Sequence, residues 1–414
     1  MHNQTSHSKS VIIIGGGAAG FFTAINAARL NPSLKMIILE KSREVLSKVR
    51  ISGGGRCNVT HHCFDPDLLS KAYPRGENVL RWSFEQFQAK DTVEWFSERG
   101  VELKTEEDGR MFPITDSSET IINCLMDEAK KHGVEIRTKT KVDSIEPQQD
   151  GGFKLQIHKS PPITCDRLIV ATGGYNRENA YGWLKDLGHS VNTPVPSLFT
   201  FNFRDKMFTD LAGISVENAL VKIIGTRYEE IGPVLITHWG LSGPAVLKLS
   251  AWAARELHDK EYRYEVKINW LYPLNDQQVR EKLKMLREEQ PKKQLKNQYE
   301  FKLPNRLWTK FLELASIQEE KRWADLSNKE IHELTKHIVH ATYTIQGKTT
   351  YKEEFVTCGG IPLNEVNPDT LESNMVPGLH FVGEVLDIDG ITGGFNFQAA
   401  WTNGWLAAQA VAGA

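Results

Sequence analysis

The sequence predicts an α/β protein in which a parallel-sheet domain is split by a long insertion with a β-rich part and a helical part. Three observations predict this order. A buried strand, a glycine-rich turn and a helix begin at residue 11, and a similar series closes the chain at 379–411. Between them, short alternating polar and apolar runs at 192–270 are followed by charge-dense helical sequence at 275–340.

The composition is that of two or three globular domains: 414 residues, 40% hydrophobic and 25% charged. A net charge of −2 gives no reason to expect nucleic acid or a membrane as the main partner. The five cysteines form no C-x-x-C pair, so we expect neither a disulfide framework nor a metal site. The polar first ten residues lack the apolar core of a signal peptide, and we expect a cytoplasmic protein.

The first predicted element is Val11–Ile14, a run of β-branched residues typical of a buried parallel strand. A glycine-rich turn follows, and apolar residues then recur at helical spacing to about residue 28. A second buried strand, Met36–Leu39, ends at Glu40. Together they form one strand–helix–strand unit of about 30 residues.

Within this unit, Gly15, Gly17 and Gly20 have the spacing of a dinucleotide-binding turn. The first glycine permits the tight turn, the second lets the backbone approach a diphosphate, and the third lets helix and strand pack closely. The helix N-terminus favours the anion. Glu40 would accept hydrogen bonds from the adenosine ribose and repel a 2′-phosphate, so NADP is not expected in this site. The alternative is a glycine-rich turn without a ligand.

A second glycine cluster lies in the Gly-, Ser- and Arg-rich segment 45–60, where Gly53–Gly55 stands between Arg50 and Arg56. Backbone N–H groups of such a loop suit a phosphate or a ring carbonyl, and a flexible surface loop is the alternative. Helices are predicted next, over 84–100 and 117–132.

The N-terminal half is predicted to end in strands. These are Lys141–Ile145, Phe153–His158 and the buried Leu168–Ala171, which leads into Thr172 and Gly173. This small turn lets a ligand lie close to the backbone, although a plain end of a strand is as good an interpretation.

The insertion is predicted to form an antiparallel sheet or barrel interrupted by one helix, Pro244–His258. His238 and Trp239 precede that helix and are candidates for substrate contact, with packing at a domain junction as the alternative. A capping box at Ser327–Glu330 marks the helical part. Strand-like sequence returns at Tyr351.

The last predicted strand, Leu379–Glu384, leads through the glycine-rich turn Gly390–Gly394 into the closing helix Phe395–Val411. A flavin ring at this second helix N-terminus would have its N1–C2=O edge against a partial positive charge, which stabilises the reduced anion. Glu384 could bind a ribityl hydroxyl. The alternative is a helix cap with solvent-facing acids.

Cys57 and Cys63 are candidates for a redox pair, because a flavin disulfide reductase needs two cysteines beside the ring. Five residues separate them and no obvious helix begins between them. Cys57 is therefore better interpreted as a small residue packed near a cofactor.

Four stretches make the chain resemble the NAD(P)/FAD-dependent oxidoreductases that include relatives of aminoacetone oxidase and 3-dehydro-bile acid reductase. They are ISGGGRCN (Ile51–Asn58), GRMFP (Gly109–Pro113), THWGLSGPA (Thr237–Ala245) and GLHFVGEVLDIDGITGGFNFQAAW (Gly378–Trp401). The resemblance covers nearly the whole chain. It implies a Rossmann-like FAD-binding domain split by an insertion with a β-barrel-like part and a helical part.

The resemblance also implies which residues contact FAD. At the adenosine diphosphate end they are Gly15, Gly17, Ala18, Ala19, Gly20, Glu40 and Val142 (through its backbone, to adenine). At the flavin end they are Ser52, Gly53, Gly54, Arg56, Cys57, Asn58, Gly383, Glu384, Asp387, Gly393, Gly394, Phe395 and Asn396. Lys41, Lys48, Thr172 and Gly173 are further expected contacts, assigned to neither end. At Tyr175–Gly182 the chain departs from the glycine-rich stretch usual in the family, and we expect that loop to shape substrate access.

We therefore predict an FAD-dependent oxidoreductase that moves hydride between flavin N5 and a small molecule, with oxidase and reductase both open. His238 and Asn396 are the candidate catalytic residues. The alternatives are a disulfide reductase using Cys57 and Cys63, and a non-catalytic flavoprotein that recognises RNA or another macromolecule. No second nucleotide unit appears between Tyr175 and Tyr351, so NAD(P)H is expected only as a transient donor.

The predicted domains are 1–192 with 351–414 (FAD-binding), 193–274 with 341–350 (β-rich) and 275–340 (helical). The sequence leaves the oligomeric state open.

Overall fold

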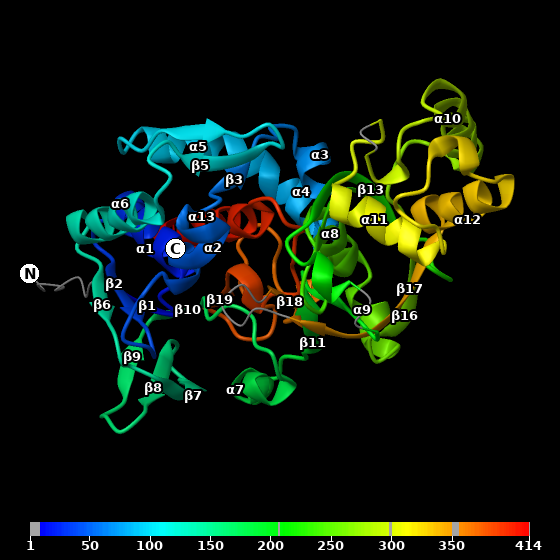
Figure 1. The fold of residues 1–414 in the computed structure, drawn as a ribbon. Helices are drawn as coiled ribbons and strands as arrows, with labels where there is room; N and C mark the ends of the chain where they lie inside the picture. The colour runs from blue at the N-terminus through cyan, green and yellow to red at the C-terminus, as the bar shows by residue number, and fades with distance from the viewer. Residues whose placement is uncertain (1–8, 206–207, 298–299, 350–355, 414) are drawn as a thin grey trace, which may run out of the picture. The chain divides into compact units, whose positions relative to one another are not determined.

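The computed structural model describes residues 9–205, 208–297, 300–349 and 356–413. The chain divides into two compact units, Met1–Ser197 with Lys352–Ala414, and Leu198–Tyr351 (Figure 1). The first unit thus combines the two ends of the chain, and the second is an insertion. The finer limits predicted at 192, 274 and 340 stay predictions, and the limit at 350, with the strand-like start at Tyr351, lies outside the described residues.

A five-stranded parallel sheet in the order β19-β10-β1-β2-β6 forms the base of the first unit. Its strands are β1 (Ser10–Ile14), β2 (Lys35–Leu39), β6 (Glu135–Arg137), β10 (Arg167–Val170) and β19 (Leu379–Phe381). The two central runs, β1 and β2, are buried almost throughout, as expected for parallel strands. Strand β6 was not predicted, because two of its three residues are charged and it carries no apolar signal.

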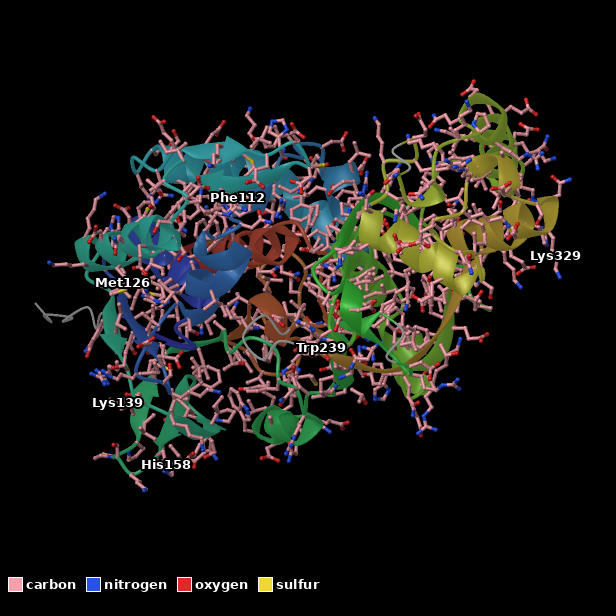
Figure 2. All side chains as sticks on the ribbon, viewed as in Figure 1. Phe112, Met126, Lys139, His158, Trp239 and Lys329 are labelled. Atoms are coloured by element: carbon pink, nitrogen blue, oxygen red, sulfur yellow. The ribbon has the colours of Figure 1, made fainter. Side chains whose placement is uncertain are left out.

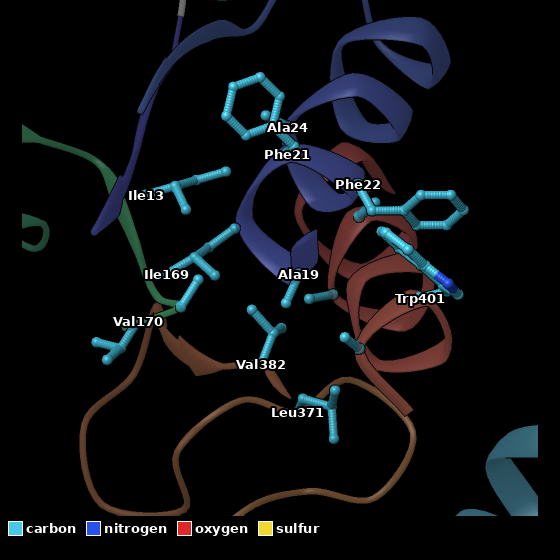
Figure 3. Packing of buried hydrophobic residues seen from close by; sticks show 14 of the residues in the cluster. Ile13, Ala19, Phe21, Phe22, Ala24, Ile169, Val170, Leu371, Val382 and Trp401 are labelled. Atoms are coloured by element: carbon cyan, nitrogen blue, oxygen red, sulfur yellow. The ribbon is translucent and has the colours of Figure 1, made fainter. Parts of the chain in front are cut away.

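The first and last long helices of the chain lie side by side (Figure 1). They are α1 (Ala18–Leu30) and α13 (Phe395–Gly413). A Cβ at Gly404 would be 3.2 Å from the carbonyl oxygen of Ala19, so the two backbones approach closely there. The rings of Phe22 and Trp401 extend this contact, with centroids 5.2 Å apart (Figure 3).

Smaller sheets and helices complete the first unit. The strands are β3 (Thr60–His61), β4 (Leu103–Thr105), β5 (Arg110–Pro113), β7 (Val142–Pro147), β8 (Phe153–Ile157), β9 (Ile163–Cys165), β11 (Asn192–Ser197) and β18 (Val356–Gly360). The helices are α2 (Ser47–Gly55), α3 (Pro66–Ser70), α4 (Glu77–Gln86), α5 (Ala89–Ser97), α6 (Ser118–Lys131) and α7 (Gly182–Lys185).

Two predicted helices are each divided in the structure. The segment predicted over 84–100 is mostly helical but is divided between the end of α4 and α5, because Phe87 is extended and Gln88 starts α5 with a capping box to Asp91. Pro244–His258 is two helices, α8 (Pro244–Trp252) and α9 (Ala254–Asp259). They are interrupted at Ala253, where φ −93° and ψ 9° leave the helical region.

The second unit contains a closed barrel in the order β12-β15-β14-β13-β16-β17, which confirms the predicted barrel-like part. Its strands are β12 (Thr200–Phe203), β13 (Ser215–Ile223), β14 (Glu229–Ile236), β15 (Gly240–Ser242), β16 (Arg263–Asn269) and β17 (Ala341–Thr349). All the pairings described between these strands are antiparallel.

The predicted helical part follows within the same unit. It consists of α10 (Asp276–Glu289), α11 (Asn305–Leu314) and α12 (Asn328–Val339). The capping box predicted at α12 is present, with Ser327 and Glu330 bonded reciprocally. Among the described segments, no helix combines the length and the apolar character that a membrane crossing requires.

Candidate cofactor-binding site

In the turn between β1 and α1, neighbouring backbone atoms leave no room for a side chain at Gly15 and Gly20, but there is free space at Gly17. A Cβ at Gly15, where φ is +117°, would lie 2.2 Å from the Ala171 oxygen, and one at Gly20 would lie 2.1 Å from the Gly15 oxygen. At Gly17, nothing lies within 4 Å of the Cβ position. Packing therefore requires glycine at the first and third positions, and free space remains where a diphosphate would approach.

The N-terminus of α1 beside this space has no side chain to cap it. Gly17 is the N-cap, and no acidic residue lies in the first turn, which begins with the small Ala18 and Ala19. The first N–H groups of a helix have no intrahelical partner. This end of α1 is therefore chemically suited to an anion.

Glu40 follows β2 directly and is held at the mouth of the same turn. Its Oε2 accepts from the Gly16 N–H at 2.8 Å, and its Oε1 accepts from the N–H and hydroxyl of Ser42, both at 2.8 Å. A carboxylate has about four lone-pair sites, so Glu40 keeps capacity for a ribose hydroxyl.

A pocket of about 390 Å³ opens at the carboxyl ends of β1 and β2. Ligands bind at this edge of open parallel sheets. Five predicted residues line it, namely Gly15, Glu40, Lys41, Val142 and Thr172. It is also lined by Ile14, Leu39, Thr140, Lys141, Asp143, Tyr175, Ala180 and Trp183, which the sequence did not indicate as cofactor contacts.

The C-terminal glycine cluster meets the start of α1. A Cβ at Gly383, where φ is +74°, would be 3.0 Å from the Cβ of Ala19. Next to it, Glu384 accepts from the Thr357 N–H at 2.8 Å and pairs with the Lys48 ammonium at 2.8 Å. The fold thus brings together predicted residues that are 336 positions apart in the chain.

The second predicted loop follows a short helical segment within α2. Its helical path breaks at Ser52, and Gly53 and Gly54 adopt positive φ angles of 58° and 69°. Nothing lies within 4 Å of a Cβ at Gly54, so this part of the loop is open. Arg56 pairs with Glu106 at 2.6 Å, and this hydrogen bond raises the pKa of its guanidinium.

Arg56 also lies over the ring of Phe112, which Figure 2 labels, at 3.9 Å from the ring centre.

Asn58 adjoins the C-terminal turn. With its amide oxygen toward Gly394, it accepts from that residue's N–H at 3.0 Å.

The turn before α13 is built on glycines with positive φ angles and is fixed from both sides. Gly393 and Gly394 have φ angles of +135° and +95°. The amide of Asn396 accepts from the Gly390 N–H at 2.9 Å and donates to the Gly390 oxygen at 3.0 Å. This candidate catalytic side chain thus closes its own turn. Asp387 accepts from the Asn192 amide at 2.6 Å.

Three residues that the sequence did not single out hold this turn. His61 Nδ1 lies 3.0 Å from the Gly393 oxygen, and its ring stacks on Phe395 at 4.5 Å. The Tyr73 hydroxyl donates to the Phe395 oxygen at 2.7 Å. Arg75 forms a two-pronged ion pair with Asp389. No local motif marks these residues, because their partners lie more than 300 positions away.

Asp389 is fully buried and Arg75 nearly so, with 0% and 14% of the side chains exposed. Burial raises the pKa of the Asp389 carboxyl above its usual value, and the charge and hydrogen bonds of Arg75 oppose that rise. The pair fixes the segment that enters the glycine turn.

The two candidate redox cysteines are unlike each other. Cys57 is fully buried, and burial raises the pKa of its thiol to about 12. Cys63 is partly buried, and burial also raises its pKa. Because thiolates are the reactive form, neither residue has the environment of an activated redox cysteine.

The remaining candidate, His238, lies in the second unit, in the turn between β14 and β15. Thr237 and Gly240 close this turn with backbone and side-chain hydrogen bonds of 2.8–3.1 Å. His238 is exposed, and the neighbouring Trp239, labelled in Figure 2, is 46% exposed.

Known proteins resemble this chain over nearly its whole length. The model of the family described as "HI0933-like protein Rossmann domain" matches residues 9–410. The ribosomal RNA dihydrouridine synthase of Haemophilus influenzae is 32% identical over 97% of this chain and 98% of the relative. The 3-dehydro-bile acid delta(4,6)-reductase of Clostridium scindens is 29% identical over 97% of this chain and 98% of the relative.

A solved structure shares the fold. It is the 3-ketosteroid delta1-dehydrogenase of Sterolibacterium denitrificans, with a TM-score of 0.54, 12% identity and coverage of 98% of this chain and 100% of that one.

Proposed function

Since this chain belongs to the family of HI0933-like proteins with a Rossmann domain and is an FAD-dependent oxidoreductase, we propose that it saturates a carbon–carbon double bond next to a carbonyl group. The names of two relatives, a delta(4,6)-reductase and a dihydrouridine synthase, both describe such a saturation. The observation that carries the cofactor assignment is the uncapped, open N-terminus of α1 beside Glu40 and the 390 Å³ pocket.

Different residues of the first unit would bind different parts of FAD. The first turn of α1 would bind the diphosphate, and Glu40 the ribose of the adenosine. Lys48, Ser52–Asn58 and Gly383–Asn396 would hold the flavin half. The N-terminus of α13 places partial positive charge at that end.

Bound FAD supplies hydride transfer at N5. The chain then has to orient the ring and the substrate, while a proton from water adds to the other carbon of the double bond, and no protein nucleophile is needed. The buried Cys57 thiol stays protonated at neutral pH and takes no part.

We propose NAD(P)H as a transient electron donor. The described strand pairs of the insertion are antiparallel, which supports the view that it carries no second parallel nucleotide unit. We also propose a cytoplasmic location, because the five cysteines are free thiols, as in a reducing compartment.

For the substrate, we propose a small unsaturated ketone. The net charge of −2 favours it over nucleic acid. Uridine in ribosomal RNA is the second candidate. It is favoured by the 32% identical relative and by Trp239, an exposed ring on a fixed turn that could stack on a base.

Two anaerobic half-reactions test the proposal. NADH or NADPH should bleach the flavin, without saturation at low micromolar nucleotide. The reduced protein is then mixed with a 3-keto-4-ene steroid or with ribosomal RNA that lacks dihydrouridine. Return of the yellow colour together with a saturated product identifies the substrate class. If neither acceptor reoxidises the flavin but oxygen does so rapidly, the protein is an oxidase and the proposal is wrong.

A further inference from the structure

The pocket at the carboxyl edge of the sheet has one aromatic wall, formed by Tyr175 and Trp183. We propose that this wall binds the adenine of FAD, so that the segment Thr172–Trp183 selects a cofactor with an adenosine end. The inference rests on the FAD assignment made above. It adds a role for a segment in which the chain departs from the glycine-rich sequence of the family it resembles.

Both rings are held in place by their own segment. The Tyr175 ring packs edge-on against Tyr181, with centroids 4.8 Å apart, and the Tyr175 N–H donates to the Tyr181 hydroxyl at 3.1 Å. Tyr181 is fully buried and so anchors this contact. The Trp183 Nε1–H donates to the Ala180 oxygen at 3.1 Å. Side chains fixed in this way lose little conformational freedom when a ligand binds.

The rest of the pocket lining has the polarity that a nucleoside needs. Ile14 and Leu39 supply apolar surface from the ends of β1 and β2, and Glu40 supplies the acceptor for a ribose hydroxyl. Lys41 lies 5.8 Å from the centre of the Tyr175 ring. Aromatic and apolar surface with a few placed polar groups is typical of small-molecule pockets, and about 390 Å³ lies within their usual size range.

The position of the wall distinguishes the two halves of the cofactor. It shares a pocket with Glu40 and with Val142, which the family resemblance assigns to the adenosine end. None of the residues assigned to the flavin end, from Ser52 to Asn58 and from Gly383 to Asn396, lines this pocket. A ligand without adenosine, such as FMN, would leave the wall without a contact.

The test is equilibrium binding to the deflavinated protein. Calorimetry with FAD, ADP and FMN is carried out on the unsubstituted chain and on Tyr175→Ala, Trp183→Ala and Trp183→Phe. Trp82→Ala is the matched control, because it removes an indole that is 65% exposed on α4, outside the pocket. The melting temperature of each apoprotein verifies folding.

We expect Trp183→Ala to raise the Kd of both FAD and ADP about tenfold and to leave the Kd of FMN unchanged. Trp183→Phe should restore most of the loss, and Trp82→Ala should change nothing. Equal weakening of FAD and FMN, or an unchanged Kd for ADP, would overturn the proposal. ADP carries no redox chemistry, so a failure of the proposed reductase activity would leave this result unaffected.

Discussion

The two glycine turns of the first unit are both assigned to cofactor binding, but they are held in place by different kinds of contact. At the N-terminal turn, Glu40 and Gly16 are 24 positions apart, within one strand–helix–strand unit. At the C-terminal turn, His61, Tyr73 and Arg75 reach Gly393, Phe395 and Asp389 across 332, 322 and 314 positions. The first turn is held mainly by its own strand–helix–strand unit, with Ala171 as a distant neighbour of Gly15, whereas the second is held by side chains of a distant segment.

This difference predicts two kinds of damage. Substitutions at the N-terminal turn can lower the affinity for the cofactor while the protein stays folded. Changes at the contacts of the C-terminal turn remove buried partners and so affect the fold first.

The largest effect is expected from Arg75→Met. It leaves the fully buried Asp389 carboxylate without its partner, which costs about 3–5 kcal/mol of unfolding free energy. The pKa of Asp389 is already raised by burial and rises further without Arg75. A carboxyl with a higher pKa in the folded than in the unfolded chain destabilises the fold as pH rises, so the loss should be smaller at pH 5 than at pH 8.

Urea unfolding at both pH values measures this loss. The control is Arg75→Met combined with Asp389→Asn, which removes both charges. It should be more stable than Arg75→Met alone at pH 8. Equal stability of the two variants would show that the ion pair does not hold the turn.

The next effect compares two glycines of the N-terminal turn. Gly20→Ala places a methyl 2.1 Å from the Gly15 oxygen and should cost about 1–3 kcal/mol, because α1 must move away from β1. Gly17→Ala has free space and a φ of −94°, so the unfolding free energy of the apoprotein should stay within about 0.5 kcal/mol. Its FAD affinity should nevertheless fall. If Gly17→Ala retained FAD fully, the diphosphate would not lie at this turn.

Glu40→Lys should raise the Kd of FAD about 10- to 100-fold, because an ammonium cannot accept the hydrogen bonds of a ribose hydroxyl. Glu44→Lys makes the same charge change at an exposed position of the same segment and serves as the control. Titration of the apoprotein with FAD, followed by flavin fluorescence, measures both. Similar weakening by the two variants would indicate a general charge effect.

The smallest effect is expected from Cys63→Ser. The structure gives this residue no activated thiol, so the rates of flavin reduction and turnover should stay within about twofold of the unsubstituted protein. Loss of turnover together with loss of a long-wavelength thiolate–flavin absorption band would support the disulfide reductase instead.

The same comparison explains what could be predicted from the sequence. Gly15, Gly17, Gly20 and Glu40 could be assigned because the spacing of a strand–helix–strand unit fixes their geometry. The turn Gly390–Gly394 could be located before α13, but its partners Tyr73 and Arg75 could not, because nothing local marks a residue that packs 300 positions away. Strand β6 was missed because its charged residues give no apolar pattern. Tyr175 could be seen only as part of a departure from the family and Trp183 was not singled out, since the pocket they line appears only in the fold.

The identity of the bound flavin tests the FAD assignment most directly. Purified protein is denatured by heat, and the released ligand is separated by chromatography against FAD and FMN. We expect FAD at about one molecule per chain, because the uncapped α1 turn, Glu40 and the adjoining pocket serve the adenosine diphosphate half of the cofactor. If the protein released FMN, or retained no flavin after reconstitution with FAD, the FAD assignment would be wrong.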